Sequence, residues 1–183
     1  MRVRGNGFTL IELMVTIAVL AIIAMMAAPS FGTMLNKRKL DNEVKGLAHV
    51  LSMARSQAVL LRTNTIIGLN SSLPSTQTNF FWTPQSNGIK IMNIPEGYNA
   101  PPNFIFNAQG MFIPGSFVKK RKETNAQGEE EWVADQIEID GVKVDQLENY
   151  PREITICSEK LNLTKTLNYS IVGTFDSITE GTC

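Results

Sequence analysis

The chain is poor in the side chains that build metal centres and nucleophilic active sites. Its 183 residues include only two cysteines, Cys157 and Cys183, and one histidine, His49. No nucleophile elbow, phosphate-binding glycine loop or metal-ligand motif occurs along it. A metal site needs more ligands than two distant cysteines and one histidine supply. We therefore expect a protein that is not an enzyme and that holds no cofactor or metal.

Net charge is also lacking. The 17 Lys and Arg residues balance the 17 Asp and Glu residues, so the formal net charge is +0. Such a balance gives no overall attraction to nucleic acid or to anionic lipid. The basic run Lys119-Lys120-Arg121-Lys122 is closely followed by Glu123 and by Glu129-Glu130-Glu131. We interpret it as a solvated, self-neutralising hairpin, with a nucleic-acid contact as the alternative.

Charge of either sign is missing from Leu13 to Asn36, a run of 24 residues. A bilayer core of about 30 Å needs roughly 20 apolar residues in a helix, so this run predicts a membrane-spanning segment. Glu12 stands at its beginning, inside a segment that is otherwise apolar. A charge within such a span costs on the order of 3 kcal/mol, which indicates that the carboxylate is there for a partner.

The residues before the apolar run indicate how the chain is processed. A secretory signal peptide is cut after its apolar region, but the small residues near Ala24–Ala28 run directly into Pro29, a poor start for a mature chain. A cut after Gly7 would instead keep the helix and create a new amine at Phe8. In lipid, that amine and Glu12 would neutralise each other across neighbouring subunits.

This arrangement resembles the class III leader of type IV pilins and type II secretion pseudopilins. Gly7 matches the residue before the cut by prepilin peptidase, Phe8 the residue that becomes N-methylated, and Glu12 the fifth mature residue. Pro29 falls where pilins carry a helix-bending proline. The resemblance implies a leader at residues 1–7 and a transmembrane and assembly helix at residues 8–31; the alternative is an ordinary N-terminal membrane anchor.

An amphipathic pattern continues the helix through residues 32–62. Apolar residues follow a 4-3 spacing that places them on one face: Leu40, Val44, Leu47, Leu51, Ala54, Ala58 and Leu61. A continuous helix from Phe8 to about Arg62 would be roughly 80 Å long. Pro29 is the expected kink, since proline removes a backbone donor and clashes one turn back.

Residues 63–183 predict a globular, β-rich domain. Short β-like runs alternate with turn residues: Thr65–Leu69, Asn79–Thr83, Ile89–Asn93, Asn103–Asn107, Met111–Val118, Trp132–Ile139, Ile154–Cys157 and Leu167–Val172. Asn87-Gly88 is a good hairpin turn, and residues 124–131 are expected to form a loop. The predicted fold is α+β: a long N-terminal helix whose second half packs on an antiparallel β-sheet system.

Two short segments extend the resemblance over most of the chain. The helix ends in Ala54-Arg55-Ser56-Gln57-Ala58, and Phe106-Asn107-Ala108-Gln109-Gly110 lies in mid-domain, as in the GspH/FimT group of minor pilins and pseudopilins. The Ile154–Cys157 strand and terminal Cys183 look more like FimU-like minor pilins. That likeness implies a structural subunit that helps to initiate and cap a pilus, with other minor pilins, the major pilin and a tip adhesin as partners.

Two other functions remain open beside the minor-pilin hypothesis. A type II secretion pseudopilin would carry the same leader. A FimT-like DNA receptor would carry a Gly-Arg-x-Arg element near the C-terminus, but the aligned place here reads Gly173-Thr174-Phe175-Asp176, with no arginine and one acid. Because DNA affinity depends on phosphate contacts from basic side chains, DNA binding is disfavoured.

Orientation and cysteine usage predict where the domain resides. Arg2 and Arg4 before the span favour an inner-membrane protein with its N-terminus inside and its C-terminal domain in the periplasm, although Lys37-Arg38-Lys39 weakens the rule. Assembly would then carry the subunit into the pilus at the cell surface. In that oxidising compartment Cys157 and Cys183 have one intramolecular pairing, and two free buried thiols are the alternative. A disulfide would pin the tail Thr174–Cys183 onto the sheet.

Overall fold

A computed structural model describes residues 8–139 and 142–183, with the backbone alone for residues 26–30, 139 and 142. The chain divides into two compact units, Met1–Arg38 and Lys39–Cys183. One helix, α1 (Leu10–Leu61), runs through the boundary between them. The predicted continuous helix is therefore present, and its second half belongs with the β-rich unit.

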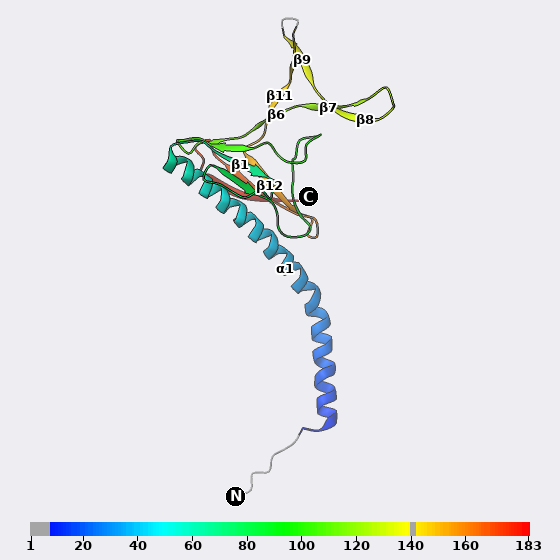
Figure 1. The fold of residues 1–183 in the computed structure, drawn as a ribbon. Coiled ribbons are helices and arrows are strands. Elements are labelled where there is room, and N and C mark those ends of the chain that lie inside the picture. The colour runs from blue at the N-terminus through cyan, green and yellow to red at the C-terminus, as the bar shows by residue number, and fades with distance from the viewer. Residues whose placement is uncertain (1–7, 140–141) are drawn as a thin grey trace. The chain divides into compact units, whose positions relative to one another are not determined.

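The apolar stripe on the second half of α1 forms one wall of the core (Figure 1). Leu40, Leu47 and Leu51 are completely buried, as predicted. Leu61 is an exception, with 42% of its surface exposed. The reason is that α1 ends at this residue and the chain turns at Arg62, whose φ is 51°. The buried stripe therefore stops at Ala58, one turn earlier than the sequence pattern predicted.

Within the described residues, the strands form two four-stranded sheets and three two-stranded ribbons. The first sheet has the order β2-β1-β4-β5, built from β1 (Thr65–Leu69), β2 (Asn79–Trp82), β4 (Phe104–Phe106) and β5 (Phe112–Ile113). β1 pairs with β2 in parallel and with β4 antiparallel. The Oγ1 of Thr65 donates to the carbonyl of Ala54 at 3.0 Å, which ties the first strand of this sheet to α1.

The second sheet has the order β14-β13-β12-β3 and is antiparallel throughout. Its strands are β3 (Ile89–Ile91), β12 (Glu153–Ser158), β13 (Leu163–Tyr169) and β14 (Phe175–Gly181). The C-terminal tail is thus a strand, and its backbone pairing with β13 holds it in addition to any disulfide. Asn87-Gly88, predicted as a hairpin turn, instead connects β2 of the first sheet to β3 of the second.

The core lies between the two four-stranded sheets and α1. Phe104 and Phe112 stack with ring centroids 5.2 Å apart, and Phe112 stacks on Tyr169 of the second sheet at 5.1 Å. Phe80 and Trp82 of β2 are also buried in this core. A buried carboxylate, Glu43, links α1 to the loop after β2 by accepting the backbone N–H groups of residues 85 and 86 at 3.1 and 2.8 Å.

Three ribbons extend from this body (Figure 1). They pair β6 (Ser116–Val118) with β11 (Leu147–Asn149), β7 (Lys120–Thr124) with β8 (Glu130–Ala134), and β9 (Gln136–Ile139) with β10 (Val142–Asp145). They meet at a closed ring of backbone hydrogen bonds. Lys119 N–H donates to Gln146, Gln146 N–H to Asp135, and Asp135 N–H to Lys119, at 2.7–2.8 Å.

The ribbons differ from the sequence expectation in two places. The predicted strand Trp132–Ile139 is divided between two ribbons, because the junction at Asp135 interrupts it. The loop expected at residues 124–131 is shorter, since both of its ends are paired in β7 and β8. The sequence pattern also did not predict the charge-bearing strands β7, β10 and β11, nor the exposed edge strand β14.

Candidate functional site

The first turn of α1 contains the residues that the leader motif singled out. Glu12 N–H donates to the Oγ1 of Thr9 at 3.3 Å, and Thr9 N–H donates to the Oε2 of Glu12 at 3.4 Å. This reciprocal arrangement is a capping box, in which each side chain satisfies a backbone donor that the helix leaves unpaired. The carboxylate also lies at the positive end of the helix dipole. Glu12 therefore stabilises the start of its own helix.

The surroundings of Glu12 are apolar and exposed. Phe8, Leu10 and Ile11 have 85%, 77% and 71% of their surfaces exposed, and the apolar side chains further along show the same pattern. Exposed apolar surface of this extent is a mark of an interaction site. Within the described residues, no helix is long and apolar enough to cross a membrane.

The remaining leader residues are placed only in part. Gly7 lies outside the described residues, so cleavage before Phe8 and methylation of Phe8 stay predictions. The backbone at Pro29 is helical within α1, but its side chain is outside the description, and the kink there also stays a prediction. Sequence reasoning missed Thr9 as the partner of Glu12, although the Thr-x-x-Glu spacing is itself a capping-box signal.

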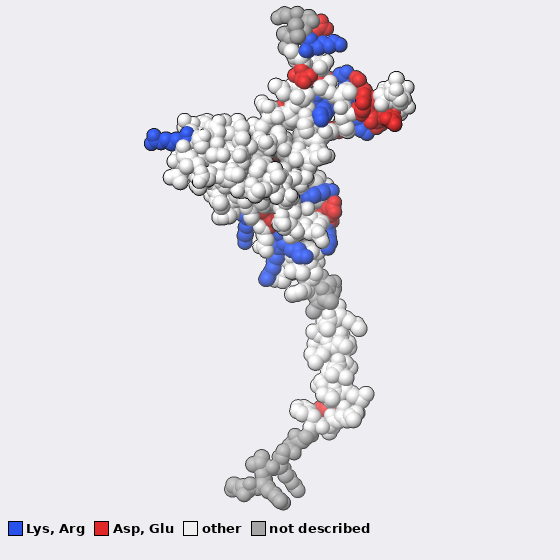
Figure 2. All heavy atoms as spheres, viewed as in Figure 1, with Lys and Arg blue, Asp and Glu red and all other residues white. Residues whose placement is uncertain are grey.

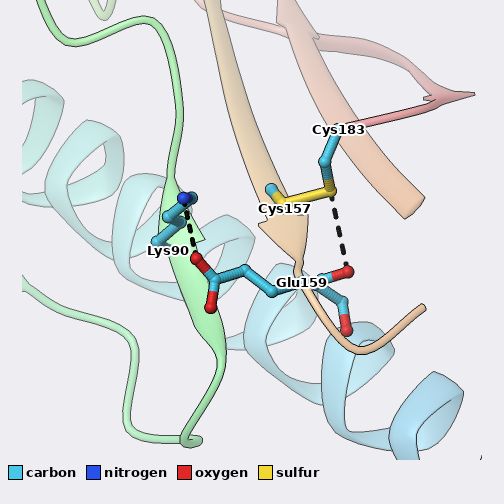
Figure 3. Close-up of a disulfide and its surroundings, with 5 residues drawn as sticks. Lys90, Cys157, Glu159 and Cys183 are labelled. Atoms are coloured by element: carbon cyan, nitrogen blue, oxygen red, sulfur yellow. Dashed lines mark hydrogen bonds and ion pairs between the residues drawn. A yellow bond between two sulfur atoms is a disulfide. The ribbon is translucent and has the colours of Figure 1, made fainter. Parts of the chain in front are cut away.

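The two cysteines form the predicted disulfide. Cys157 on β12 and Cys183 at the end of the chain have Cα atoms 5.7 Å apart, and Cys157 is completely buried (Figure 3). An ion pair lies beside it, with the Nζ of Lys90 2.7 Å from the Oε1 of Glu159. That pair lowers the pKa of the Glu159 carboxyl, chiefly through the hydrogen bond from Lys90. The bridge joins a central strand of the second sheet to the residues that follow its edge strand.

Two cations of the basic run, Arg121 and Lys122, pair with acids close to them in the ribbons. Arg121 contacts Glu123 at 2.6 Å and Asp135 at 2.7 Å, while Lys122 contacts Glu130 at 2.7 Å. The hydrogen bond from Lys122 lowers the pKa of Glu130, and the bond to Glu123 raises the pKa of Arg121. Figure 2 shows blue and red side chains interspersed over this part of the chain. The hairpin predicted for this run is present, and its self-neutralisation holds for Arg121 and Lys122; the Nζ of Lys120 instead donates to the carbonyl of Gly97 at 3.1 Å and lies over the ring of Tyr98.

Arg55 joins three segments that are far apart in the sequence. Its Nε donates to the carbonyl of Gly110 at 3.1 Å, and its Nη2 donates to the carbonyl of Val172 at 3.3 Å. The two short motifs quoted from the sequence, residues 54–58 and 106–110, therefore meet directly. Gly173 packs against the same turn. Only glycine fits at this position, because a Cβ there would overlap the carbonyl oxygen of Gly110. Nothing in the local pattern indicated this junction.

In the described ranges, no group of three or more His, Cys, Asp or Glu residues is arranged to hold a metal ion.

One comparison with known protein families found a match, at the N-terminal end of the chain. Residues 2–28 match the prokaryotic N-terminal methylation motif. No curated protein and no solved structure gives a significant match to the chain. The motif supports a type IV pilin-like protein, a class that includes the pseudopilins, and it implies processing by prepilin peptidase and assembly with other pilins. The α+β fold, with a long N-terminal helix on a β-sheet-rich domain, is consistent with that class.

Proposed function

We propose that the chain is a minor type IV pilin of the FimU-like kind, a structural subunit that helps to initiate the pilus and is incorporated into it. The observation that carries this proposal is the first half of α1. It has a methylation motif, exposed apolar side chains on every face and Glu12 as its one charge before Lys37. Such a helix needs an apolar environment, first lipid and then the helices of neighbouring subunits.

The rest of the chain supports an exported structural subunit. The Cys157–Cys183 disulfide suits an oxidising compartment, as expected for a domain in the periplasm before assembly. Other minor pilins, the major pilin and a tip adhesin are the proposed partners, and twitching motility is the proposed process. The acids that pair with the β7 cations, and the absence of arginine at residues 173–176, favour protein partners over DNA.

Deletion of the gene tests this function against its alternatives. Twitching, protein secretion and DNA uptake are scored separately, and each defect is complemented with the wild-type gene. We expect loss of twitching with normal secretion. Loss of secretion with intact pili would instead identify a type II secretion pseudopilin, and loss of DNA uptake alone would identify a FimT-like receptor. Mass spectrometry of the mature protein should find methylated Phe8 at its N-terminus.

Glu12 provides a more specific test of the assembly step. An unpaired carboxylate in lipid is costly, so the incoming amine of Phe8 gains most by neutralising it. Glu12→Ala should leave the protein stable in the membrane but poorly incorporated into pili, measured by quantitative blotting of sheared filaments. Thr9→Ala is the matched control, because it removes the hydroxyl half of the capping box and leaves the carboxylate. Normal incorporation of Glu12→Ala would remove the pairing argument.

A further inference from the structure

A pocket of about 320 Å³ opens between α1 and the turn that joins β13 to β14. One wall is a stripe of α1 that includes Leu51, Ser52 and Arg55. The other wall is formed around the turn by Tyr169, Thr174 and Phe175. This volume is at the lower end of the range for ligand-binding pockets, and it suits one or two side chains of a partner.

Arg55 offers a free hydrogen-bonding edge at this pocket. A guanidinium group has five N–H donors in a planar fork. The edge formed by Nε and Nη2 is used by the carbonyls of Gly110 and Val172. The edge formed by Nη1 and Nη2 is available to a ligand. In the described part of the chain, no carboxylate forms an ion pair with Arg55. That edge has the geometry to hold a carboxylate with two parallel hydrogen bonds.

The wall opposite Arg55 is apolar. The rings of Tyr169 and Phe175 meet edge to face with centroids 5.9 Å apart. Phe175 keeps 47% of its surface exposed, and Ile178, further along the same strand, keeps 44%. Ile178 pairs with the fully buried Leu167, so it lies on the core-facing side of the sheet, where α1 does not cover it. The pocket therefore combines one unpaired cation with a half-exposed apolar wall.

We propose that this pocket binds the side-chain carboxylate of an acidic residue in a partner protein, with a neighbouring aliphatic residue of that partner packed on Phe175. Charge complementarity selects the acid, because among the described residues Arg55 alone brings a charge to the lining of the pocket. A nucleic acid would need several cations to hold successive phosphates, and the nearby Lys165 is already paired with Asp41 and Glu180. This site goes beyond the proposed function and does not depend on the chain being a pilus subunit.

The test is a titration of the full chain, isotope-labelled in detergent micelles, followed by NMR. The probe is the peptide acetyl-Ala-Leu-Glu-Leu-Ala-amide, and its control has Gln in place of Glu. We expect saturable shifts at the amides of Ser52, Thr174 and Phe175 and at the Arg55 Nε–H. The Gln peptide should bind about tenfold more weakly, because it loses the charge-assisted bonds. Equal binding of the two peptides would overturn the proposal.

Variants separate the pocket from the rest of the surface. Ser52→Leu should weaken binding of the Glu peptide by about tenfold or more, because the larger side chain fills the pocket. The Ser52 hydroxyl forms no hydrogen bond with any part of the chain that the structure describes, so none of those bonds is lost. Ser56→Leu, one turn along the exposed face of α1 and outside the pocket, should change affinity by less than about twofold. Unchanged binding by Ser52→Leu would refute the site.

Arg55→Lys keeps the charge but loses the fork, and it should also weaken the peptide by about tenfold. Arg55 also donates hydrogen bonds to the carbonyls of Gly110 and Val172, so Arg55→Lys can disturb the fold as well as the pocket. This variant is therefore interpreted together with Ser52→Leu, which leaves both hydrogen bonds intact. Single-stranded DNA that shifts the same resonances more strongly than the Glu peptide would overturn the choice of a protein partner.

Discussion

Removal of the disulfide by Cys183→Ser should lower the stability of the β-rich unit without abolishing its fold. The bridge closes a loop whose ends are 26 residues apart, and that loop contains β13 and β14. Loss of the constraint on the unfolded chain costs about 3.5 kcal/mol by the chain-entropy argument. For a unit of this size, we expect the melting temperature to fall by about 10 °C.

The fold should survive because the tail does not depend on the bridge alone. β14 keeps its antiparallel register with β13 from Thr164↔Gly181 to Asn168↔Ser177. Cys183 is exposed, so serine is tolerated there. Cys157 is completely buried, and Cys157→Ser should cost more, because it also buries a hydroxyl in the core.

Thermal unfolding followed by circular dichroism, with and without reductant, provides the measurement. The wild-type protein in reductant should unfold at the temperature of Cys183→Ser, and the variant should be insensitive to reductant. A wild-type melting temperature that does not change on reduction would refute the reasoning, as would two free thiols in protein purified from an oxidising compartment.

Three further predictions concern packing and buried polar groups. Gly173→Ala should destabilise the fold by about 3 kcal/mol in chemical denaturation, because the Cβ overlaps a carbonyl and φ is +76°; Gly128→Ala, with a similar φ of +82° and open space, should cost only about 1 kcal/mol. Glu43→Ala should cost about 2–3 kcal/mol, since two backbone N–H groups lose a charged acceptor, and Glu43→Gln should cost less; equal losses would contradict this reason. Burial raises the pKa of both Tyr150 and Tyr169 to about 12. Their neutral forms are favoured in the folded state, so stability should be intact below pH 10 and fall between pH 10 and 12, as seen by tyrosinate absorbance together with circular dichroism.

The helix and its assembly end could be predicted because their signals are local. The 4-3 spacing from Leu40 to Ala58 fixes which side of α1 faces the core. The order Gly7-Phe8, Glu12 and a charge-free run is a linear pattern, and it lies within residues 2–28, which match the prokaryotic N-terminal methylation motif. The disulfide followed from composition, since two cysteines allow only one intramolecular pair.

Strand pairing could not be predicted in the same way. The alternation in Thr65–Leu69 and Asn79–Trp82 identifies two strands but not their relative direction, and the short connection between them favours an antiparallel pair. The structure pairs them in parallel. The turn at Asn87-Gly88 likewise has hairpin chemistry, yet it connects two sheets.

The amino-acid sequence by itself determined the long helix, its buried stripe, the methylation motif that contains Glu12 and the one available disulfide. The first three depend on residues that are close together in the sequence. The disulfide depends on the number of cysteines, because two cysteines allow only one intramolecular pair. Only the tertiary structure decided that Arg55 meets the turns at Gly110 and Val172, and that three ribbons close at Lys119, Asp135 and Gln146. In each contact a side-chain or backbone donor reaches a backbone carbonyl of a distant segment, and no sequence pattern encodes which carbonyl a distant donor will reach.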